Sequence, residues 1–262
     1  MSIQFTIGST LIIKDTPAPS TLTIDDTTFL NFNGGTATLT SSASAPTNNA
    51  LFDYVVNGAD QTYDFKHNTI EYNGTYTGFK GLFDVTSANI EIRNLKILVK
   101  SAPEDIEGYL IVNGEDGSPN KGTVKCCSLE IDVEGTDKYA GLIGDYFQGD
   151  ISCCYMKHLN KQVITRDDGG WITGTHFNGN VKFCYSTGDI GDFGGGISGR
   201  TTASDNGSAT FQYCYSTGSI GSSGGGILGS GTANNGSATL QYCYSTGSIG
   251  SSGGGILGSG TA

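Results

Sequence analysis

The chain of 262 residues contains 41 Gly, 36% hydrophobic and 15% charged residues, and carries a formal net charge of −11. This acidity makes nucleic acid and anionic membranes poor partners for the surface as a whole. No segment approaches the roughly 20 apolar residues that insertion across a membrane needs. The many glycines, with 10% aromatic residues and recurring Ile, Val and Thr, favour thin β-structure with many turns over disorder.

The first 49 residues carry no repeat and predict an N-terminal β cap. Residues 3–7 (IQFTI) and 21–24 (TLTI) alternate like strands, and Pro17 and Pro19 separate them. We expect residues 1–49 to shield the first coil of a solenoid, because a bare end exposes strand edges. The N-terminus lacks the basic and apolar regions of a secretory signal. We therefore expect synthesis in a reducing cytoplasm.

Residues 50–180 contain two kinds of short apolar segment in alternation. In the first kind, an apolar residue is followed by a polar one, as at Ile92, Val124 and Ile151, with a weaker copy at Phe65. This alternation is typical of a half-buried strand. The second kind is flanked by glycine at residues 141–144 and 171–174, and its degenerate forms are residues 50–53 and 81–84. We interpret residues 50–180 as degenerate coils of a β-helix.

Residues 181–262 contain the clearest repeat. The string YCYSTGSIGSSGGGILGSGTA occurs at residues 213–233 and again at 242–262, and CYSTGDIGDFGGGISG occupies residues 184–199. A unit of this length without helical periodicity cannot bury its own apolar side, but stacked units can. The sequence therefore predicts an all-β fold, a parallel, right-handed β-helix with coils of about 27–32 residues. Because Ala262 falls inside a repeat, we expect a truncated array.

Three side-chain ladders follow from this stacking. One cysteine per coil should lie inside as a small apolar thiol and form a structural ladder. A tyrosine comes next and should point outward, where the rings stack either on sugars or on one another. A serine follows as the third. The cysteines are Cys127, Cys154, Cys184, Cys214 and Cys243; the tyrosines are Tyr155, Tyr185, Tyr215 and Tyr244; the serines are Ser186, Ser216 and Ser245.

Two further cysteines, Cys126 and Cys153, directly precede ladder cysteines. Vicinal pairs such as Cys126 and Cys127 make poor disulfides because the geometry is strained. No C-x-x-C motif or His pair accompanies any of the seven cysteines, so a zinc site is not indicated. We expect free thiols.

The strings at residues 184–199 and 214–229 resemble the GLUG-type repeat, in which a Cys-Tyr-x-Thr-Gly segment alternates with a Gly-Gly-Leu/Ile-x-Gly segment. The close match covers residues 181–262, and a degenerate match extends back to about residue 50. The resemblance implies a parallel β-helix displayed on a cell or particle surface, as in large bacterial surface proteins and repeat proteins of giant DNA viruses. It brings no catalytic residues to this chain.

Acidic pairs are the candidates for catalysis or metal binding. Glycoside hydrolysis needs two carboxylates that face each other across a cleft, and Asp25-Asp26, Asp167-Asp168 and the pair Asp189 and Asp192 are the options. We interpret each as a solvated turn. The last two pairs could together offer oxygen ligands to calcium, although the calcium-binding nonapeptide is absent.

The three histidines, His67, His158 and His176, are interpreted as surface or packing residues. No cofactor, metal or enzymatic activity is expected from these patterns.

We therefore expect a structural surface protein: a fibre, spike or appendage of a virus particle or cell. The free cysteines and the missing leader favour the virion. Self-association into a trimer or filament is expected, with a surface glycan, a capsid or a cell surface as further partners. Two alternatives remain open, a carbohydrate-binding adhesin module and a β-helical polysaccharide-active enzyme.

Overall fold

The computed structural model describes residues 80–85, 89–100, 106–133, 138–160, 163–204 and 206–260, together with the strands that precede residue 80. These residues form strands, bridges and turns, and no helix occurs among them. No helix in this part of the chain therefore has the length and hydrophobicity that crossing a bilayer requires. The prediction of an all-β fold is confirmed.

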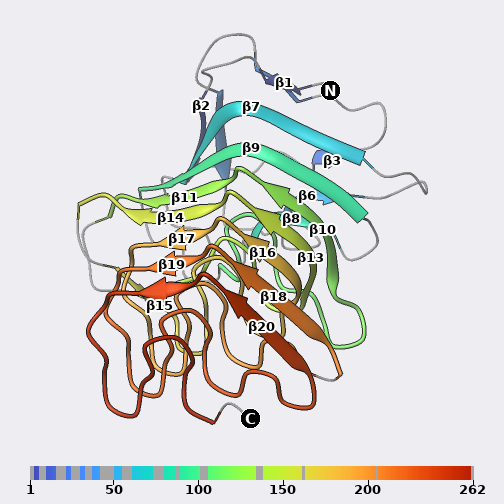
Figure 1. Ribbon diagram of the computed structural model, residues 1–262. Coiled ribbons are helices and arrows are strands. Elements are labelled where there is room, and N and C mark those ends of the chain that lie inside the picture. Colours follow the sequence, from blue (N-terminus) through green and yellow to red (C-terminus); the bar gives the residue numbers. More distant parts are fainter. Residues whose placement is uncertain are drawn as a thin grey trace.

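One wall of the molecule is a ladder of parallel strands, each contributed by one coil (Figure 1). The strands are β9 (Asn89–Val99), β10 (Asn120–Lys125), β13 (Phe147–Ser152), β16 (Asn178–Lys182), β18 (Ser208–Gln212) and β20 (Ser237–Gln241). Val124 pairs with Ile92 on one side and with Ile151 on the other, at offsets of 32 and 27 residues. The later offsets are 30, 30 and 29 residues. The predicted parallel β-helix and its coil length are thus confirmed.

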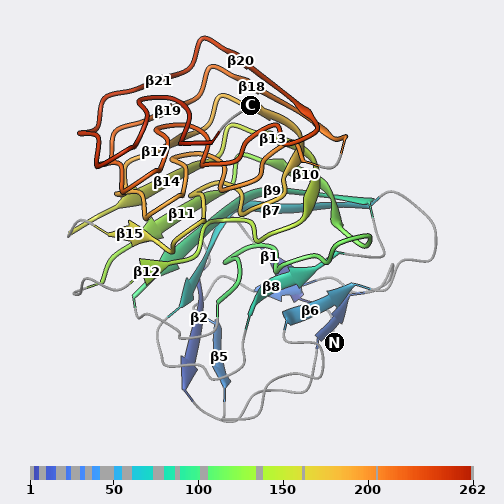
Figure 2. The ribbon, with the colours of Figure 1, turned by 90° about the horizontal axis from the view of Figure 1, so that it is seen from below.

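A second wall begins after a sharp corner, and its strands are also parallel. It is formed by the second half of β9 with β11 (Ser128–Ile131), β14 (Tyr155–His158), β17 (Tyr185–Ser186), β19 (Tyr215–Ser216) and β21 (Tyr244–Ser245). The view turned by 90° shows how each coil closes around a common interior (Figure 2).

The glycine-flanked segments form the third wall through single parallel bridges. Phe83 is bridged to Ile111, and Ile111 to Ile143. The bridges continue through Thr173, Ser198, Leu228 and Leu257. Two short strands, β12 (Lys138–Tyr139) and β15 (Ile164–Thr165), pair nearby.

The N-terminal strands add to the solenoid in parallel. β2 (Thr10–Asp15) pairs with β5 (Ala37–Ser41) and with β7 (Gln61–Tyr72), and β7 pairs with β9. β3 (Leu22–Ile24) pairs with β6 (Ala50–Tyr54), which pairs with β8 (Gly81–Asp84); β1 (Ile3–Phe5) pairs with β4 (Leu30–Phe32). The division into a cap over 1–49 and degenerate coils over 50–180 stays a prediction.

The register corrects one assignment in β7. The sequence pattern placed Phe65 opposite Ile92, but Tyr63 occupies that position. The register shifts between Asp64 and Asn68, where β7 contains extra residues at the corner. Periodicity alone did not reveal this bulge, because Phe65 also fits an apolar position and is itself buried.

The corner between the first two walls is held by residues other than glycine. The residue before each ladder cysteine has a φ between 52° and 58°. These residues are Cys126, Cys153, Phe183, Tyr213 and Tyr242. Left-handed backbone costs a residue with a Cβ roughly 1–2 kcal/mol, so the packing of the coils must offset this cost at every turn.

Glycine is required on the third wall because neighbouring chain segments approach closely. A Cβ at Gly226 would lie 2.1 Å from the carbonyl oxygen of Gly255 and 2.4 Å from the Cβ of Ser245. No side chain fits at that separation, so the close approach of the next coil, and not positive φ, explains this glycine.

Candidate functional site

The ladder cysteines lie one per coil inside the first corner. Cys127, Cys154, Cys184 and Cys214 are buried, and Cys243 is partly exposed in the last described coil. The thiol of Cys154 lies 3.8 Å from the carbonyl oxygen of Val124 in the preceding coil. Burial raises the pKa of the Cys127 and Cys184 thiols well above the ordinary value. Thiols with so raised a pKa are poor nucleophiles, so Cys127 and Cys184 serve packing.

The tyrosine ladder forms a continuous stack on the outside of the second wall. Ring centroids are 5.2 Å apart for Tyr155 and Tyr185, 4.9 Å for Tyr185 and Tyr215, and 5.1 Å for Tyr215 and Tyr244, with interplanar angles of 8° or less. Each inner ring therefore has both faces covered by neighbouring rings. A sugar could reach the ring edges and hydroxyl groups, but not the faces of these inner rings.

The ladder ends in a charged cluster at Tyr155. Its hydroxyl group donates a hydrogen bond to Oε1 of Glu130 at 2.9 Å. The ammonium group of Lys157 lies 5.1 Å from the centroid of the same ring and 5.6 Å from that of Tyr185. This cation–π contact and the hydrogen bond fix the first rings of the stack.

A second aromatic stack runs parallel to the first and was missed by the sequence analysis. It consists of Phe183, Tyr213 and Tyr242, whose centroids are 5.1 Å and 4.9 Å apart. Their side chains are 55%, 49% and 74% exposed. The aromatic residue before the cysteine in the repeated string Tyr-Cys-Tyr could have indicated this stack. Strand alternation, however, would direct that residue to the same face as the apolar residue two positions earlier. The left-handed corner turns it outward instead.

The serine ladder joins two walls across the interior. Oγ of Ser186 donates to the carbonyl oxygen of Gly196 at 2.6 Å, and Oγ of Ser216 donates to that of Gly226 at 2.5 Å. Both serines are buried, and buried hydroxyl groups need such partners. The serines therefore hold the glycine-rich wall against the tyrosine-bearing wall.

The carboxylates of Asp167 and Asp168 form hydrogen bonds and ion pairs with neighbouring coils. Oδ1 of Asp167 accepts a hydrogen bond from the backbone N–H of Asp192 at 3.1 Å, and its Oδ2 lies 2.5 Å from Nζ of Lys138. Asp168 pairs with Arg200 at 3.4 Å. Asp25 and Asp26 lie outside the described residues.

Asp189 and Asp192 also bind the backbone of the next coil. Oδ1 of Asp189 accepts from the N–H of Ser219 at 2.6 Å, and Oδ1 of Asp192 accepts from that of Ser222 at 2.8 Å. Among the described residues, no group of three or more His, Cys, Asp and Glu side chains is arranged to hold a metal ion. The acidic pairs thus act as links between coils.

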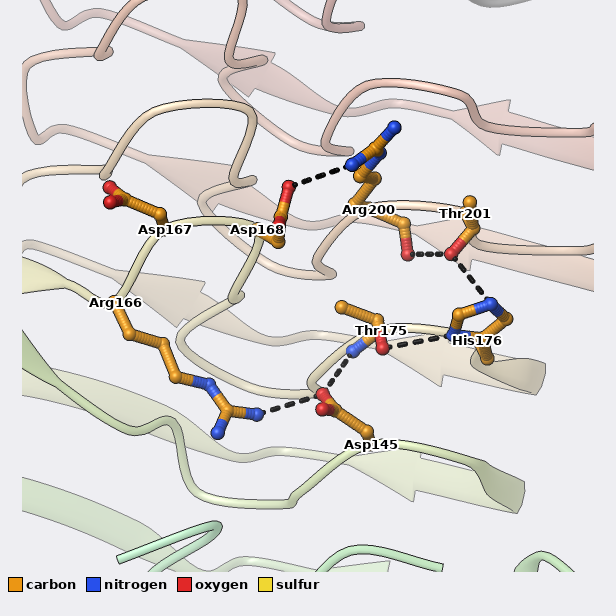
Figure 3. A pocket seen from close by; sticks show the side chains of 8 residues that line it. All are labelled: Asp145, Arg166, Asp167, Asp168, Thr175, His176, Arg200 and Thr201. Carbon is orange, nitrogen blue, oxygen red and sulfur yellow. Dashed lines mark hydrogen bonds and ion pairs between the residues drawn. The ribbon is translucent and has the colours of Figure 1, made fainter. Parts of the chain in front are cut away.

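A polar pocket of about 410 Å³ opens beside this turn and takes side chains from three successive coils (Figure 3). Oδ1 of Asp145 lies at its floor, where it accepts hydrogen bonds from Nη2 of Arg166 at 2.8 Å and from the N–H of Thr175 at 2.6 Å. The guanidinium of Arg200 lies on the opposite side, 5.7 Å from the ring of Phe193. Two cations thus flank the opening.

His176 lines this pocket at one side (Figure 3). Its Nδ1 is 2.9 Å from Oγ1 of Thr175, and its Nε2 is 3.2 Å from Oγ1 of Thr201 (Figure 3). Its ring stacks on Tyr146 at 4.3 Å, with an interplanar angle of 7°. A second hollow of about 610 Å³ is also lined by His176, together with Tyr146 and Gln148. We call these two hollows together the polar groove.

The other two histidines are not part of the groove. His67 is exposed at the corner of β7 with a φ of 61°. His158 is partly buried on β14, and its Nδ1 has no hydrogen-bond partner among the described residues. The sequence analysis did not identify the groove, because its residues come from coils about 25–30 positions apart and share no motif.

The described residues define a parallel β-solenoid whose coils are linked by side-chain ladders. Comparisons with protein-family models, with curated proteins and with solved structures found no match. The resemblance to the GLUG-type repeat therefore stays a prediction that rests on the strings at residues 184–199 and 214–229.

Proposed function

We propose that this chain is a structural element of a surface: a fibre, spike or appendage of a virus particle or cell. The observation that carries the proposal is the set of ladders that repeat from coil to coil. Thiols, hydroxyl groups, aromatic rings and carboxylates each contact their equivalents or the backbone in the adjacent coil. This repetition stabilises a rod along its axis, because the stability of a solenoid depends on the contacts between adjacent coils.

Surface display is tested by antibodies raised against the purified chain. Applied to intact particles or cells of the source, they should label the outside as strongly as they label detergent-opened samples. Labelling that appears only after opening would overturn the surface role. A capsid or cell-surface partner should then be recovered by cross-linking on the intact particle, with the detergent-opened sample as the control.

Self-association into a trimer or filament belongs to the same proposal. The Phe183 stack lies exposed on the flank, and such aromatic rows are favourable contact surfaces. Light scattering over a range of protein concentrations should give a defined trimer or a mass that grows with concentration. A mass equal to one chain at all concentrations would contradict self-association.

A carbohydrate-binding module is the second candidate, and the polar groove favours it. Arg166, Arg200 and Gln148 supply hydrogen-bond donors around the fixed ring of His176. Concave surfaces with a planar ring and a few converging polar groups are typical of ligand sites. A polysaccharide-active enzyme has weaker support, because Asp167 and Asp168 are already paired with Lys138 and Arg200.

A glycan array separates the groove from the tyrosine ladder as the binding surface. Binding that His176→Ala abolishes and Tyr215→Ala preserves would assign it to the groove, and the reverse pattern would assign it to the ladder. Absence of binding across the array would remove this candidate. Incubation of a broad polysaccharide panel with the chain, followed by assay for reducing or unsaturated ends, tests the enzyme alternative.

A further inference from the structure

Two of the seven cysteines differ from the ladder thiols in both position and exposure. Cys126 and Cys153 occupy the left-handed corner, with φ values of 52° and 56°. Both are exposed. In later coils the same corner position holds the exposed rings of Phe183, Tyr213 and Tyr242. In these two early coils, thiols stand where later coils stack aromatic rings.

The two thiols belong to neighbouring coils and lie side by side in register. Lys125 pairs with Ser152 in the ladder of β10 and β13, so the next residues, Cys126 and Cys153, are also opposite each other. The N–H of Cys126 donates to the carbonyl oxygen of Ser152 at 2.9 Å, which holds the corner in place. Because the two residues share one backbone conformation, their Cα–Cβ bonds point the same way.

We propose that Cys126 and Cys153 are a redox modification site, where a reversible disulfide links adjacent coils. Neighbouring parallel strands lie about 4.8 Å apart, within the Cα separation of roughly 4.4–6.8 Å seen in disulfides. Side chains that point the same way keep nearly that separation at Cβ, slightly above the usual roughly 3.5–4.5 Å. The bond therefore needs a small local approach, and that strain makes it easier to reduce.

The chemistry is thiol–disulfide exchange with a low-molecular-weight disulfide such as oxidised glutathione. The thiolate of one cysteine attacks a sulfur of the small disulfide, which releases one small thiol and leaves a mixed disulfide on the protein. The thiolate of the other cysteine attacks the protein sulfur of that bond and releases the second small thiol. Two protein thiols lose two protons and two electrons, and the small disulfide gains both.

The remaining thiols provide an internal standard. Cys127 and Cys154 are adjacent in sequence to the pair, but they point into the interior and are buried.

The pKa of the Cys126 thiol is raised, mainly by burial and secondly by the neighbouring Cys153. Formation of the disulfide should therefore accelerate as pH rises, because only the thiolate attacks.

The test uses the full chain in its folded state, treated with oxidised glutathione and then digested. Two of the seven thiols should disappear without unfolding, the mass should fall by about 2 Da for the two hydrogens lost, and fragment ions should join Cys126 to Cys153. The linked peptides should separate on addition of dithiothreitol.

Matched variants keep the test decisive. Cys153→Ser should stop at the mixed disulfide on Cys126 and keep a mass one glutathionyl group higher, whereas Cys243→Ala should form the link as the parent does. Circular dichroism confirms that each variant is folded. A native chain that keeps all its thiols, or that joins Cys126 to any other cysteine, would overturn the proposal.

Discussion

The early and late coils share one backbone path but fill it differently. Two residues after the ladder cysteine, the early coils carry Leu129 and Met156, and the later coils carry Ser186 and Ser216. All four are buried. In the early coils this position adds apolar volume to the interior. In the later coils, the serine hydroxyl group reaches a glycine carbonyl oxygen on the opposite wall.

The comparison shows that an unchanged register tolerates two kinds of interior at this position, an apolar one and a hydrogen-bonded one. Trp171 is fully buried near the change between them, and its Nε1 donates to the carbonyl oxygen of Asp189 at 2.9 Å. A Cβ at Gly188 would lie 2.5 Å from that ring. Gly188 thus leaves room for the buried indole ring at the coil where serine replaces the larger apolar side chain.

Exchanging the two interiors should have the largest effect. Leu129→Ser removes a buried apolar side chain and leaves a buried hydroxyl group, so we expect a loss of about 4 kcal/mol in the free energy of unfolding. Ser216→Ala removes the hydrogen bonds of its hydroxyl group to Gly226 and Ser245, at a cost of about 1–2 kcal/mol. Urea unfolding measures both. Equal losses would show that the two interiors do not differ in the way proposed.

The hydrogen-bonded interior should also be sensitive to a single added methyl group. Gly226→Ala places a Cβ against Gly255 and Ser245, and we expect it to cost about 3 kcal/mol. Gly255→Ala is the matched control from the identical repeat, because its Cβ would meet only Ile249 at 3.7 Å. That change should alter the free energy of unfolding by less than about 0.5 kcal/mol. A similar loss at both positions would contradict the close approach of the next coil at Gly226.

The thiol ladder predicts how stability depends on pH under reducing conditions. The pKa values of the buried thiols of Cys127 and Cys184 are raised in the folded chain, whereas unfolded thiols ionise near about pH 8.5. Above that pH the unfolded chain binds fewer protons, so the free energy of unfolding falls as pH rises, by about 1.4 kcal/mol per pH unit for each thiol. Below it, this contribution is fully present.

Unfolding measured between pH 8 and pH 10 (about the range between thiol and tyrosine ionisation) checks this slope. Cys184→Ala should flatten it by about one thiol's share. Tyr215→Phe removes a group outside the thiol ladder whose pKa burial raises further above the ordinary tyrosine value, so it should leave the slope unchanged below about pH 9. An identical slope in the parent and in Cys184→Ala would exclude the raised thiol pKa as its cause.

The outer aromatic stack should contribute least. Tyr213 stacks on Phe183 and on Tyr242, so Tyr213→Ala should cost about 1–2 kcal/mol. Tyr242→Ala removes the ring contact with Tyr213 alone within the described stack and should cost about half as much. Thermal unfolding compares the two, and a larger loss at Tyr242 would contradict an additive stack.

The ladders could be predicted because equivalent residues recur at one offset. In a parallel solenoid, that recurrence places Cys154 beside Cys184 and Tyr185 beside Tyr215 whatever the details of the turns. The corner residues could not be predicted in the same way. Alternation describes a strand, and at Phe183 and Tyr213 the chain leaves the strand for left-handed backbone, which turns the side chain outward.

The sequence by itself determined the class of fold, the length of the coil and the residues that meet between adjacent coils, because these depend on one repeated spacing. Only the tertiary structure decided what meets across a coil and around its corners. The exposure of Cys126 and Cys153 and the groove at His176 depend on how the chain turns at its corners. The hydrogen bond from Ser186 to Gly196 depends on how far apart two walls lie. That separation results from the packing of all three walls, and no local pattern in the chain encodes it.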